Sequence, residues 1–434
     1  MFYRLLCLFS LLFFADALLA QEVTFNSDIA PIIHKNCTPC HRSGEAAPFE
    51  LITYNDVAKR ASFIKEVVTT GYMPPWKPDP HYTEFANERK LSAADINLIR
   101  KWVDAKAPEG KGKAPKPPVF IAGTQYNRKP DLVLSIDKPY LVKGDNQERF
   151  LVFKIPFELA DSMNVEAIEF VSSNKQTIHH ANFAFHPVEE DIDIKTPAPF
   201  VNLTEDSRTN YDQYLPFKKK MTYYGGWIPG TTYESYPKDM GWVMPKRGVV
   251  LLTIHYAPIA KDDDNLSSIN VFFKKTPIKR PVKVISIGSG GIGEKEIDPF
   301  FFIPAGQVKT FKVKVTTPVM DQSLMYVWPH MHLLGKSFRA YAVTPTGDTI
   351  KLVSIPDWDF RWQEIYRFKN LVKIPEKSVL IVEGTYDNTA NNPDNPNNPP
   401  KMVFSSGDMK STDEMMTLLM VFLPYQPGDE TLEL

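Results

Sequence analysis

Cysteine and histidine are both scarce in this chain. Of its 434 residues, three are cysteine and nine are histidine. Cys7 lies in the N-terminal apolar run, and Cys37 and Cys40 are too close together for the usual long-range disulfide. An exported chain without disulfides has to rely on its hydrophobic cores and on any bound cofactors.

An excess of charge of one sign is also lacking. The 50 Lys and Arg residues nearly balance the 51 Asp and Glu residues, which leaves a net charge of −1. Proteins that bind nucleic acids usually present a basic surface, so we expect no nucleic-acid partner. Proline outnumbers glycine, 37 to 21, which favours strands joined by rigid loops over long helices.

Long apolar runs are missing after the N-terminus. At the N-terminus itself, Arg4 precedes an apolar run from Leu5 to Phe14, and small residues follow at Ala17 and Ala20. This pattern predicts a secretory signal peptide cleaved near Ala20, and hence an exported protein that is periplasmic or extracellular. The alternative is an uncleaved membrane anchor, but the run is short for a bilayer span. We expect no transmembrane span in the mature chain.

The two remaining cysteines belong to the motif CTPCH, residues 37 to 41. C-x-x-C-H is the attachment signature of c-type haem, in which both thiols add to haem vinyl groups and the histidine binds iron. The motif therefore predicts Cys37, Cys40 and His41 as the haem-binding residues. A redox pair or half of a zinc site are the alternatives, but zinc needs further ligands and a second C-x-x-C is absent.

Helices are predicted on both sides of this motif, over Ser27–His34 and from the capping box at Ser92 to about Ala107. The region resembles small c-type cytochromes. The sixth iron ligand should come from the loop between the helices. Met73 is the best candidate, since a thioether suits electron transfer, and His81 is the alternative. Met73 could instead only pack on the haem edge, and we expect His34 to be a surface or helix-packing residue.

The rest of the chain reads as short strands. Residues 110 to 129 have the composition of a linker. Alternating or apolar runs at 149–155, 249–255, 307–315 and 379–386 predict strands of all-β sandwiches. Residues 391 to 400, NNPDNPNNPP, predict an exposed loop.

Six of the nine histidines lie in this β region, at positions 179, 180, 186, 255, 330 and 332. His330 and His332 would face the same side of one strand and could share a metal. His179 and His180 could do so only at a bend or strand end. We interpret His186 as structural.

The order of the motifs resembles the copper type II, ascorbate-dependent monooxygenases, which include the peptidylglycine α-hydroxylating and dopamine β-monooxygenases. The motifs are His179-His180, the strand end at His255-Tyr256, the H-x-H-x-L-G-K sequence at 330–336, and Asp413-Glu-Met415. The sequence GWIPG at 226–230 also resembles a loop of that family. The resemblance covers about residues 130 to 425.

The resemblance implies two eight-stranded jelly-roll-like domains with two coppers facing each other across an open cleft. His179, His180 and His255 would bind one copper. His330, His332 and Met415 would bind the other, where oxygen binds. A thioether favours Cu(I) over zinc or hard cations. Because Met416 follows Met415, the register could differ by one residue.

The chain also departs from that family. Its members are rich in disulfides, and the peptide-amidating enzyme holds a substrate carboxylate with an arginine, an asparagine and a tyrosine. Trp328, Thr417 and Leu419 stand at those positions here. We therefore expect a more apolar pocket and not a glycine-extended peptide as substrate.

We expect a multidomain fold: a signal peptide over 1–20, an all-α cytochrome c-like domain over 21–109, a linker over 110–129, and two copper β-sandwich domains over 130–284 and 285–434. The expected function is an exported copper- and haem-dependent monooxygenase that hydroxylates a C–H bond of a small organic substrate with O₂. Its electrons would come from a redox protein or ascorbate and pass through the haem to the coppers. The alternative is a non-catalytic copper–haem protein that carries electrons or binds copper; a zinc or structural metal protein is disfavoured by Met415.

Overall fold

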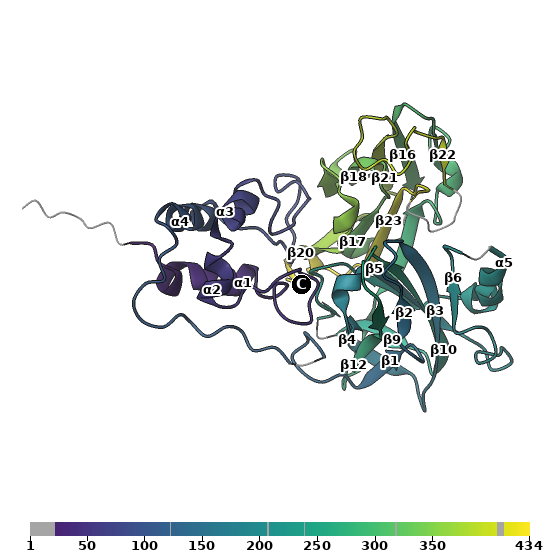
Figure 1. Ribbon diagram of the computed structural model, residues 1–434. Coiled ribbons are helices and arrows are strands. Elements are labelled where there is room, and N and C mark those ends of the chain that lie inside the picture. The colour runs from purple at the N-terminus through teal and green to yellow at the C-terminus, as the bar shows by residue number, and fades with distance from the viewer. Residues whose placement is uncertain (1–21, 122, 206–207, 238, 317–318, 406–411) are drawn as a thin grey trace, which may run out of the picture.

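The structure is a computed structural model that describes residues 22–121, 123–205, 208–237, 239–316, 319–405 and 412–434. The predicted signal peptide lies outside these residues. The fold is mostly β, with 37% of residues in strands and 15% in helices. Figure 1 shows helices α1 to α4, within residues 30–104, on one side of the strands and the short helix α5 (Arg208–Tyr211) on the other side. No helix in the described ranges has the length and apolarity needed to cross a membrane.

The N-terminal helices surround a small apolar core. A π-helical turn at Phe25–Ile29 leads into α1 (Ala30–Asn36), followed by α2 (Tyr54–Ala58), α3 (Ala61–Thr69) and α4 (Ala93–Asp104). The predicted capping box is confirmed. The Ser92 side chain accepts a hydrogen bond from the Asp95 amide, and the Asp95 carboxylate accepts a hydrogen bond from the Ser92 amide. Ile33, Ile99 and Trp102 are fully buried between these helices. Residues 106 to 131 contain no helix or strand among those described.

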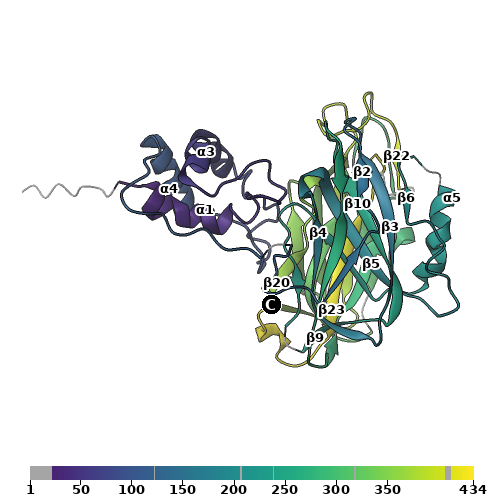
Figure 2. The ribbon, with the colours of Figure 1, turned by 60° about the horizontal axis from the view of Figure 1, so that its bottom comes forward.

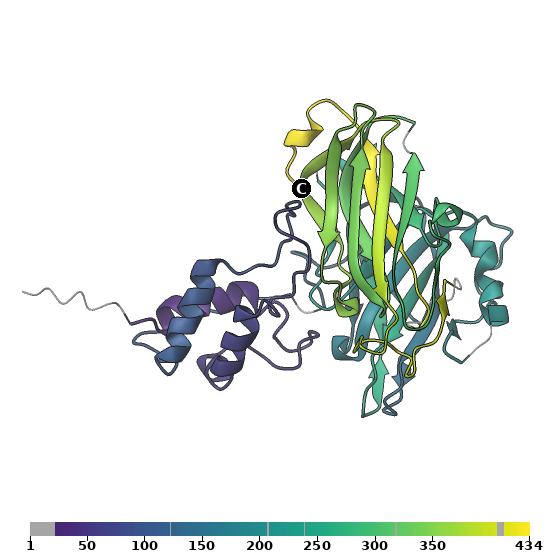
Figure 3. The same cartoon turned by 90° about the horizontal axis from the view of Figure 1, so that it is seen from above.

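The strands form two pairs of sheets, which Figure 2 and Figure 3 show from two further directions. In the first pair, one sheet has the order β1 (Leu132–Ser135), β12 (Ser267–Phe273), β4 (Met163–Ser172), β9 (Met240–Met244), β13 (Arg280–Pro281), with β8 (Glu234–Ser235) beside β4. Its partner sheet has the order β6 (Phe200–Asn202), β3 (Arg149–Glu158), β10 (Arg247–Tyr256), β5 (Ile178–Pro187), β7 (Tyr223–Trp227). Outside both lie the small pair β2 (Tyr140–Val142) and β11 (Asp263–Asn265), the short helix α5 (Arg208–Tyr211) and a 3-10 helix at Asp212–Lys219.

The second pair begins at β14 (Lys283–Gly288), which includes the predicted domain boundary at residue 284. One sheet has the order β14, β23 (Thr417–Pro424), β17 (Gln322–His330), β20 (Tyr366–Ile374). The other has the order β16 (Val308–Thr316), β21 (Val379–Asp387), β18 (Gly335–Val343), β19 (Thr349–Ile355), with β15 (Phe302–Ile303) and β22 (Val403–Phe404) paired separately. The four strands predicted from the sequence are confirmed as β3, β10, β16 and β21, and residues 391–400 form a loop.

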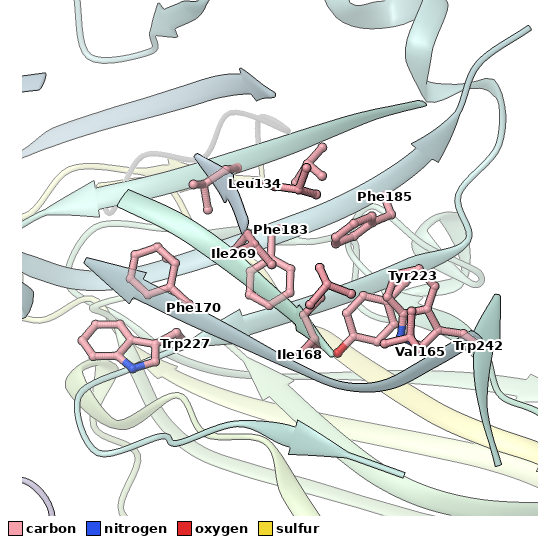
Figure 4. Close-up of a cluster of buried hydrophobic side chains, with 14 of the residues drawn as sticks. Leu134, Val165, Ile168, Phe170, Phe183, Phe185, Tyr223, Trp227, Trp242 and Ile269 are labelled. Carbon is pink, nitrogen blue, oxygen red and sulfur yellow. The ribbon is translucent and has the colours of Figure 1, made fainter. Parts of the chain in front are cut away.

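Apolar side chains from facing sheets fill the interior of each pair. Figure 4 shows the first core, where Phe183 and Phe185 of β5 meet side chains of β4, β7, β9 and β12. The rings of Tyr223 and Trp242 stack in parallel, with centroids 4.6 Å apart. The alternation of apolar residues along these strands places one face of each sheet in the core.

Glu234 is a buried carboxyl at the edge of this core and makes stability depend on pH. It is 8% exposed and accepts a hydrogen bond from the Tyr223 hydroxyl. Burial raises the pKa of Glu234 to about 7. Between the ordinary value of 4.5 and about 7, the folded chain keeps a proton that the unfolded chain releases.

The protonated Glu234 therefore contributes its full stability below about pH 4.5. This contribution to the free energy of unfolding, roughly 3 kcal/mol, is lost as pH rises through about 7. We expect the difference in the free energy of urea unfolding between the wild type and Glu234→Gln to change by about this amount between pH 5 and pH 8. A difference that stays constant across that range would contradict the assignment.

A buried ion pair joins helices α1 to α4 and their loops, here called the helical part, to the first pair of sheets. The Glu45 carboxylate lies 3.0 Å from the Lys175 ammonium, and their side chains are 10% and 5% exposed. Arg42 and Gln125 also donate to this carboxylate, at 2.9 and 3.0 Å. Because Glu45 follows His41 by four residues and Lys175 precedes His179 by four, the pair holds two of the predicted metal-binding segments side by side.

Removing one partner of this pair should be costly, because the other charge stays buried. We expect Lys175→Ala to lower the free energy of unfolding by about 3 kcal/mol, measured by urea denaturation. Lys220→Ala is the matched control, since its pair with Glu189 is exposed and should contribute less than about 1 kcal/mol. Equal losses in the two variants would rule out a special role for the buried pair.

Residues 76–91, here called the arm, join the helical part to the second pair of sheets. Phe85 forms a β-bridge with Phe368, and the Ala86 amide donates to the Arg367 carbonyl at 2.8 Å. The Trp76 ring packs edge-on against Tyr366, with centroids 5.4 Å apart. The helical part is thus packed on both pairs of sheets.

Candidate metal centre

The first histidine group consists of His179 and His180 on β5 and His255 on β10. The two strands pair in regular antiparallel register up to His255, which faces His180, but Tyr256 faces Ile178. His179 is therefore the extra residue of a β-bulge. The bulge turns the His179 ring to the same side of the strand as the His180 ring. The sequence allowed adjacent histidines to converge only at a bend, and this irregularity supplies one.

The ring nitrogens of this group face one another. Nδ1 of His179 lies 3.1 Å from Nδ1 of His255, and one nitrogen from each of the three rings lies within 4.8 Å of the others. Two nitrogens bound to one metal at about 2.0–2.1 Å would be about 3.3 Å apart in a tetrahedral site. Nδ1 of His180 is buried without a hydrogen-bond partner among the described residues. This donor set fits a metal ion.

Burial keeps the His179 and His180 rings in the neutral form that binds metals. Burial, followed by the neighbouring His255, lowers the pKa of His179 to about 3, and the same two causes lower the pKa of His180. Neutral imidazoles have a free nitrogen lone pair for a metal. The His255 ring is held by stacking on Phe150, with centroids 3.8 Å apart.

The second histidine group consists of His330 at the end of β17 and His332 in the turn that follows. Their Nε2 atoms are 3.2 Å apart, again a spacing that one metal would impose. The two were expected on one face of a strand, but β17 ends at His330 and the turn brings His332 to it. Nδ1 of His332 lies 2.9 Å from the Asp413 carbonyl, so a proton on Nδ1 would put the lone pair on Nε2, the atom that faces His330.

Glu414 ties the methionine segment to this turn. Its carboxylate accepts hydrogen bonds from the amides of His332, at 2.9 Å, and Leu334, at 2.6 Å. Met416 is fully buried in the second core, and its sulfur packs against Gly384. Met415 precedes it, is half-buried, and adjoins Glu414. Because Met416 is occupied in the core, Met415 is the better candidate ligand of the two.

The two histidine groups lie against each other. The centroids of the His180 and His330 rings are 6.5 Å apart. The Phe360 ring sits between the groups, with centroid distances of 4.9 Å to His179 and 5.7 Å to His332. The open cleft implied by the family resemblance is therefore not found between these residues, because Phe360 and the rings fill the space.

Residues 357–363, here called the bridge segment, connect both groups with the helical part. Gln363 hydrogen-bonds to His330 through its side chain and accepts the Trp328 indole N–H through its carbonyl, at 3.0 Å. Lys77 of the arm pairs with Asp357 at 2.9 Å. The Arg361 guanidinium lies 5.9 Å from the centre of the Tyr72 ring, next to Met73. One short segment thus contacts both histidine groups and the loop of the candidate haem ligand.

The CTPCH motif follows α1 in a helical turn. The amides of Cys40 and His41 both donate to the Cys37 carbonyl, at 3.1 and 2.9 Å, which winds the motif into a tight turn. Nδ1 of His41 lies 3.0 Å from the Phe49 carbonyl, so a proton there leaves Nε2 free to bind iron. Both thiols are free, and burial raises the pKa of Cys37 to about 12, which disfavours a reactive thiolate pair. These residues fit a covalently attached haem.

The surroundings of the remaining candidate iron ligands and histidines differ. Met73 is half-buried and packs against the same apolar cluster as Cys37. His81 is exposed. His34 is buried, and its Nε2 lies 3.1 Å from the Ile52 carbonyl, as a helix-packing residue would be. His186 is buried in the same way, with Nδ1 2.8 Å from the Lys220 carbonyl, and belongs to neither histidine group.

Sequence reasoning missed Phe360, Gln363, Glu414 and Lys175. Glu414 could have been noticed as a carboxylate beside a candidate ligand. Phe360 and Gln363 lie in a stretch without a motif, and Lys175 looked like an ordinary surface lysine.

Comparisons with known proteins do not identify a family. No family model matches the chain, and no curated protein matches it. Among solved structures, the major capsid protein P2 of bacteriophage PM2 is 8% identical over 69% of this chain and 99% of its own, with a TM-score of 0.24. A structure of infectious bursal disease virus, Gx strain, is 11% identical over 72% of this chain and 77% of its own, with a TM-score of 0.16. An oxalate decarboxylase mutant from Bacillus subtilis is 9% identical over 74% and 82%, with a TM-score of 0.12. Such low scores carry no argument about function.

Proposed function

We propose that this protein is an exported copper- and haem-dependent monooxygenase, similar to the copper type II ascorbate-dependent enzymes and fused to an N-terminal cytochrome c-like domain. The two pairs of sheets would be its jelly-roll-like copper domains. The observation that carries the proposal is the pair of converging histidine groups, with facing nitrogens 3.1 and 3.2 Å apart. Met415, if its thioether completes the second group, would favour copper over zinc.

The reaction has a simple balance. One atom of O₂ is inserted into a substrate C–H bond and the other leaves as water, which consumes two electrons and two protons. When bound, copper would supply oxygen activation and haem would supply single-electron transfer. The chain's own residues hold His179, His180 and His330 neutral through burial and orient His332 through Glu414 and Asp413, and Phe360 would exclude water between the groups.

The proposed substrate pocket would be lined largely by apolar side chains. Trp328 and Leu419 line a small space of about 10 Å³ together with Val284 and Val421. These apolar residues support the expectation that the substrate is not held by a carboxylate clamp at these positions. Trp328 precedes His330 by two residues in the sequence, so this apolar wall would lie close to the second histidine group.

The test begins with metal and haem content of the full chain, expressed with haem attachment and loaded with copper. We expect about two copper ions and one covalently bound haem per chain, with haem retained on a denaturing gel. Cys37→Ala/Cys40→Ala should abolish covalent haem, whereas His34→Ala should retain it. An ¹⁸O₂ experiment with a panel of small organic compounds then tests for one labelled oxygen in a product.

Each result decides a part of the proposal. Zinc in preference to copper, or no metal above background, would remove the oxygen chemistry. Two coppers and haem without labelled product from any compound would favour the alternative, a non-catalytic copper–haem electron carrier or copper-binding protein. Copper, haem and labelled product together would establish the monooxygenase.

A further inference from the structure

A cavity of about 200 Å³ lies where the arm meets both pairs of sheets. It is lined by Asn87 and Arg89 of the arm, by residues 230–234 of the first pair and, in the second, by Tyr326, Glu364, Ile365 and Arg367. It shares Glu234, Tyr326 and Ile365 with the smaller space that reaches Trp328 and Leu419. Residues from three distant parts of the chain therefore form one polar chamber.

The Arg367 guanidinium is the unusual group in this chamber. Its Nε atom is buried without a hydrogen-bond partner among the described residues, and the nearby Glu234 carboxyl interacts with the guanidinium electrostatically. It lies 5.4 Å from the centre of the Tyr326 ring, and its main-chain amide donates to Asn87 at 3.0 Å. By contrast, Arg89 is paired with Glu364 at 2.5 Å. Buried polar groups are almost always satisfied, so an unpartnered guanidinium nitrogen beside a cavity indicates an absent partner.

A second polar atom of the chamber is also unpartnered. Oε1 of Glu234, a residue only 8% exposed, has no hydrogen bond among the described residues. Thr231, which is half-buried, and Thr232, which is exposed, also line the chamber. These residues offer hydroxyl donors and a carboxyl oxygen around the guanidinium.

We propose that this cavity binds a small monocarboxylate, held by the Arg367 guanidinium and by the hydroxyls of Thr231 and Thr232. The planar guanidinium matches a carboxylate in a two-pronged hydrogen-bonded pair. A doubly charged phosphate is disfavoured, because Glu234 and Glu364 also line the chamber. A singly charged acid can instead share a proton with Glu234, whose pKa burial raises to about 7.

The walls indicate an organic acid and not an inorganic ion. Tyr326 and Ile365 present apolar surface beside the polar groups. The smaller space continues from them toward Trp328, two residues before His330. If the bound acid is also the substrate, which rests on the proposed function, its apolar end would extend toward the second histidine group.

Isothermal calorimetry on the full chain tests the site, with benzoate as probe, benzamide as its neutral isostere, and inorganic phosphate as the competing anion. We expect benzoate to bind at least tenfold more tightly than benzamide or phosphate. Arg367→Met should reduce benzoate affinity at least tenfold, while Arg100→Met, an exposed arginine on α4, should leave it unchanged. Circular dichroism checks that both variants are folded.

The comparison of benzoate with benzamide uses the wild-type chain, so the proposal can fail even if Arg367→Met does not fold. Equal binding of the two probes, tighter binding of phosphate, no benzoate binding in the millimolar range, or full affinity in folded Arg367→Met would each overturn it. Binding is measured with and without copper. The carboxylate site and the monooxygenase function can therefore fail separately.

Discussion

We expect His255→Ala to lower the copper content of the loaded protein from about two ions to about one per chain. His255 is 0% exposed, and its Nδ1 faces that of His179 at 3.1 Å, so its loss removes one of three converging donors. The remaining pair is an incomplete site that copper should leave during dialysis. Inductively coupled plasma mass spectrometry measures the result.

His186→Ala is the matched control for this prediction. His186 is also buried on β5, and its ring nitrogen already bonds to a backbone carbonyl. Its removal should cost stability, by about 1–3 kcal/mol, without changing copper content. If the two variants lose copper equally, general destabilisation and not ligand loss would be the cause. Unchanged copper in His255→Ala would exclude the residue from the site.

Phe360→Ala is expected to weaken copper binding at both histidine groups by about tenfold or more, although Phe360 offers no ligand atom. Its ring contacts His179 and His332, one in each group. Truncation leaves a cavity that lets both sets of rings rotate and admits water. Cu(II) electron paramagnetic resonance should report changed spectra for both sites, because ring orientation sets the copper coordination.

A core phenylalanine away from the histidines separates this effect from simple loss of stability. Phe157 is 5% exposed and packs on Phe185 in the first core. Phe157→Ala and Phe360→Ala should each cost about 3–5 kcal/mol of unfolding free energy. Only Phe360→Ala should change the copper spectra. Identical spectra in both variants would mean that Phe360 is packing alone, whereas Phe360→Leu should restore part of the wild-type spectrum.

Local patterns predicted much of the fold. The strands over 149–155 and 249–255 were recognisable because apolar residues recur at strand spacing and turns separate them. The helix after Ser92 was predicted from its capping box, a signal contained within four residues. Such features depend on near neighbours in sequence, so the sequence alone reveals them.

The arrangement of the site depended on long-range contacts. His179, His180 and His255 were predicted as one group, but the β-bulge that turns His179 inward arises only when β5 pairs with β10. Phe360 comes from a loop distant from every histidine motif. The cleft implied by the family resemblance was not found because the rings of His180 and His330 meet, and no local pattern sets that distance.

The packing of the helical part also bears on the order in which the protein matures. The Cys40 sulfur lies against the loop at Gly230, with Arg89 on the same side, and Glu45 is joined to Lys175 nearby. Any enzyme that attaches haem must reach both thiols of the motif. If the chain carries the proposed haem, that haem would have to be attached before the helices pack on the strands, which would make assembly of the two parts a late step in biogenesis.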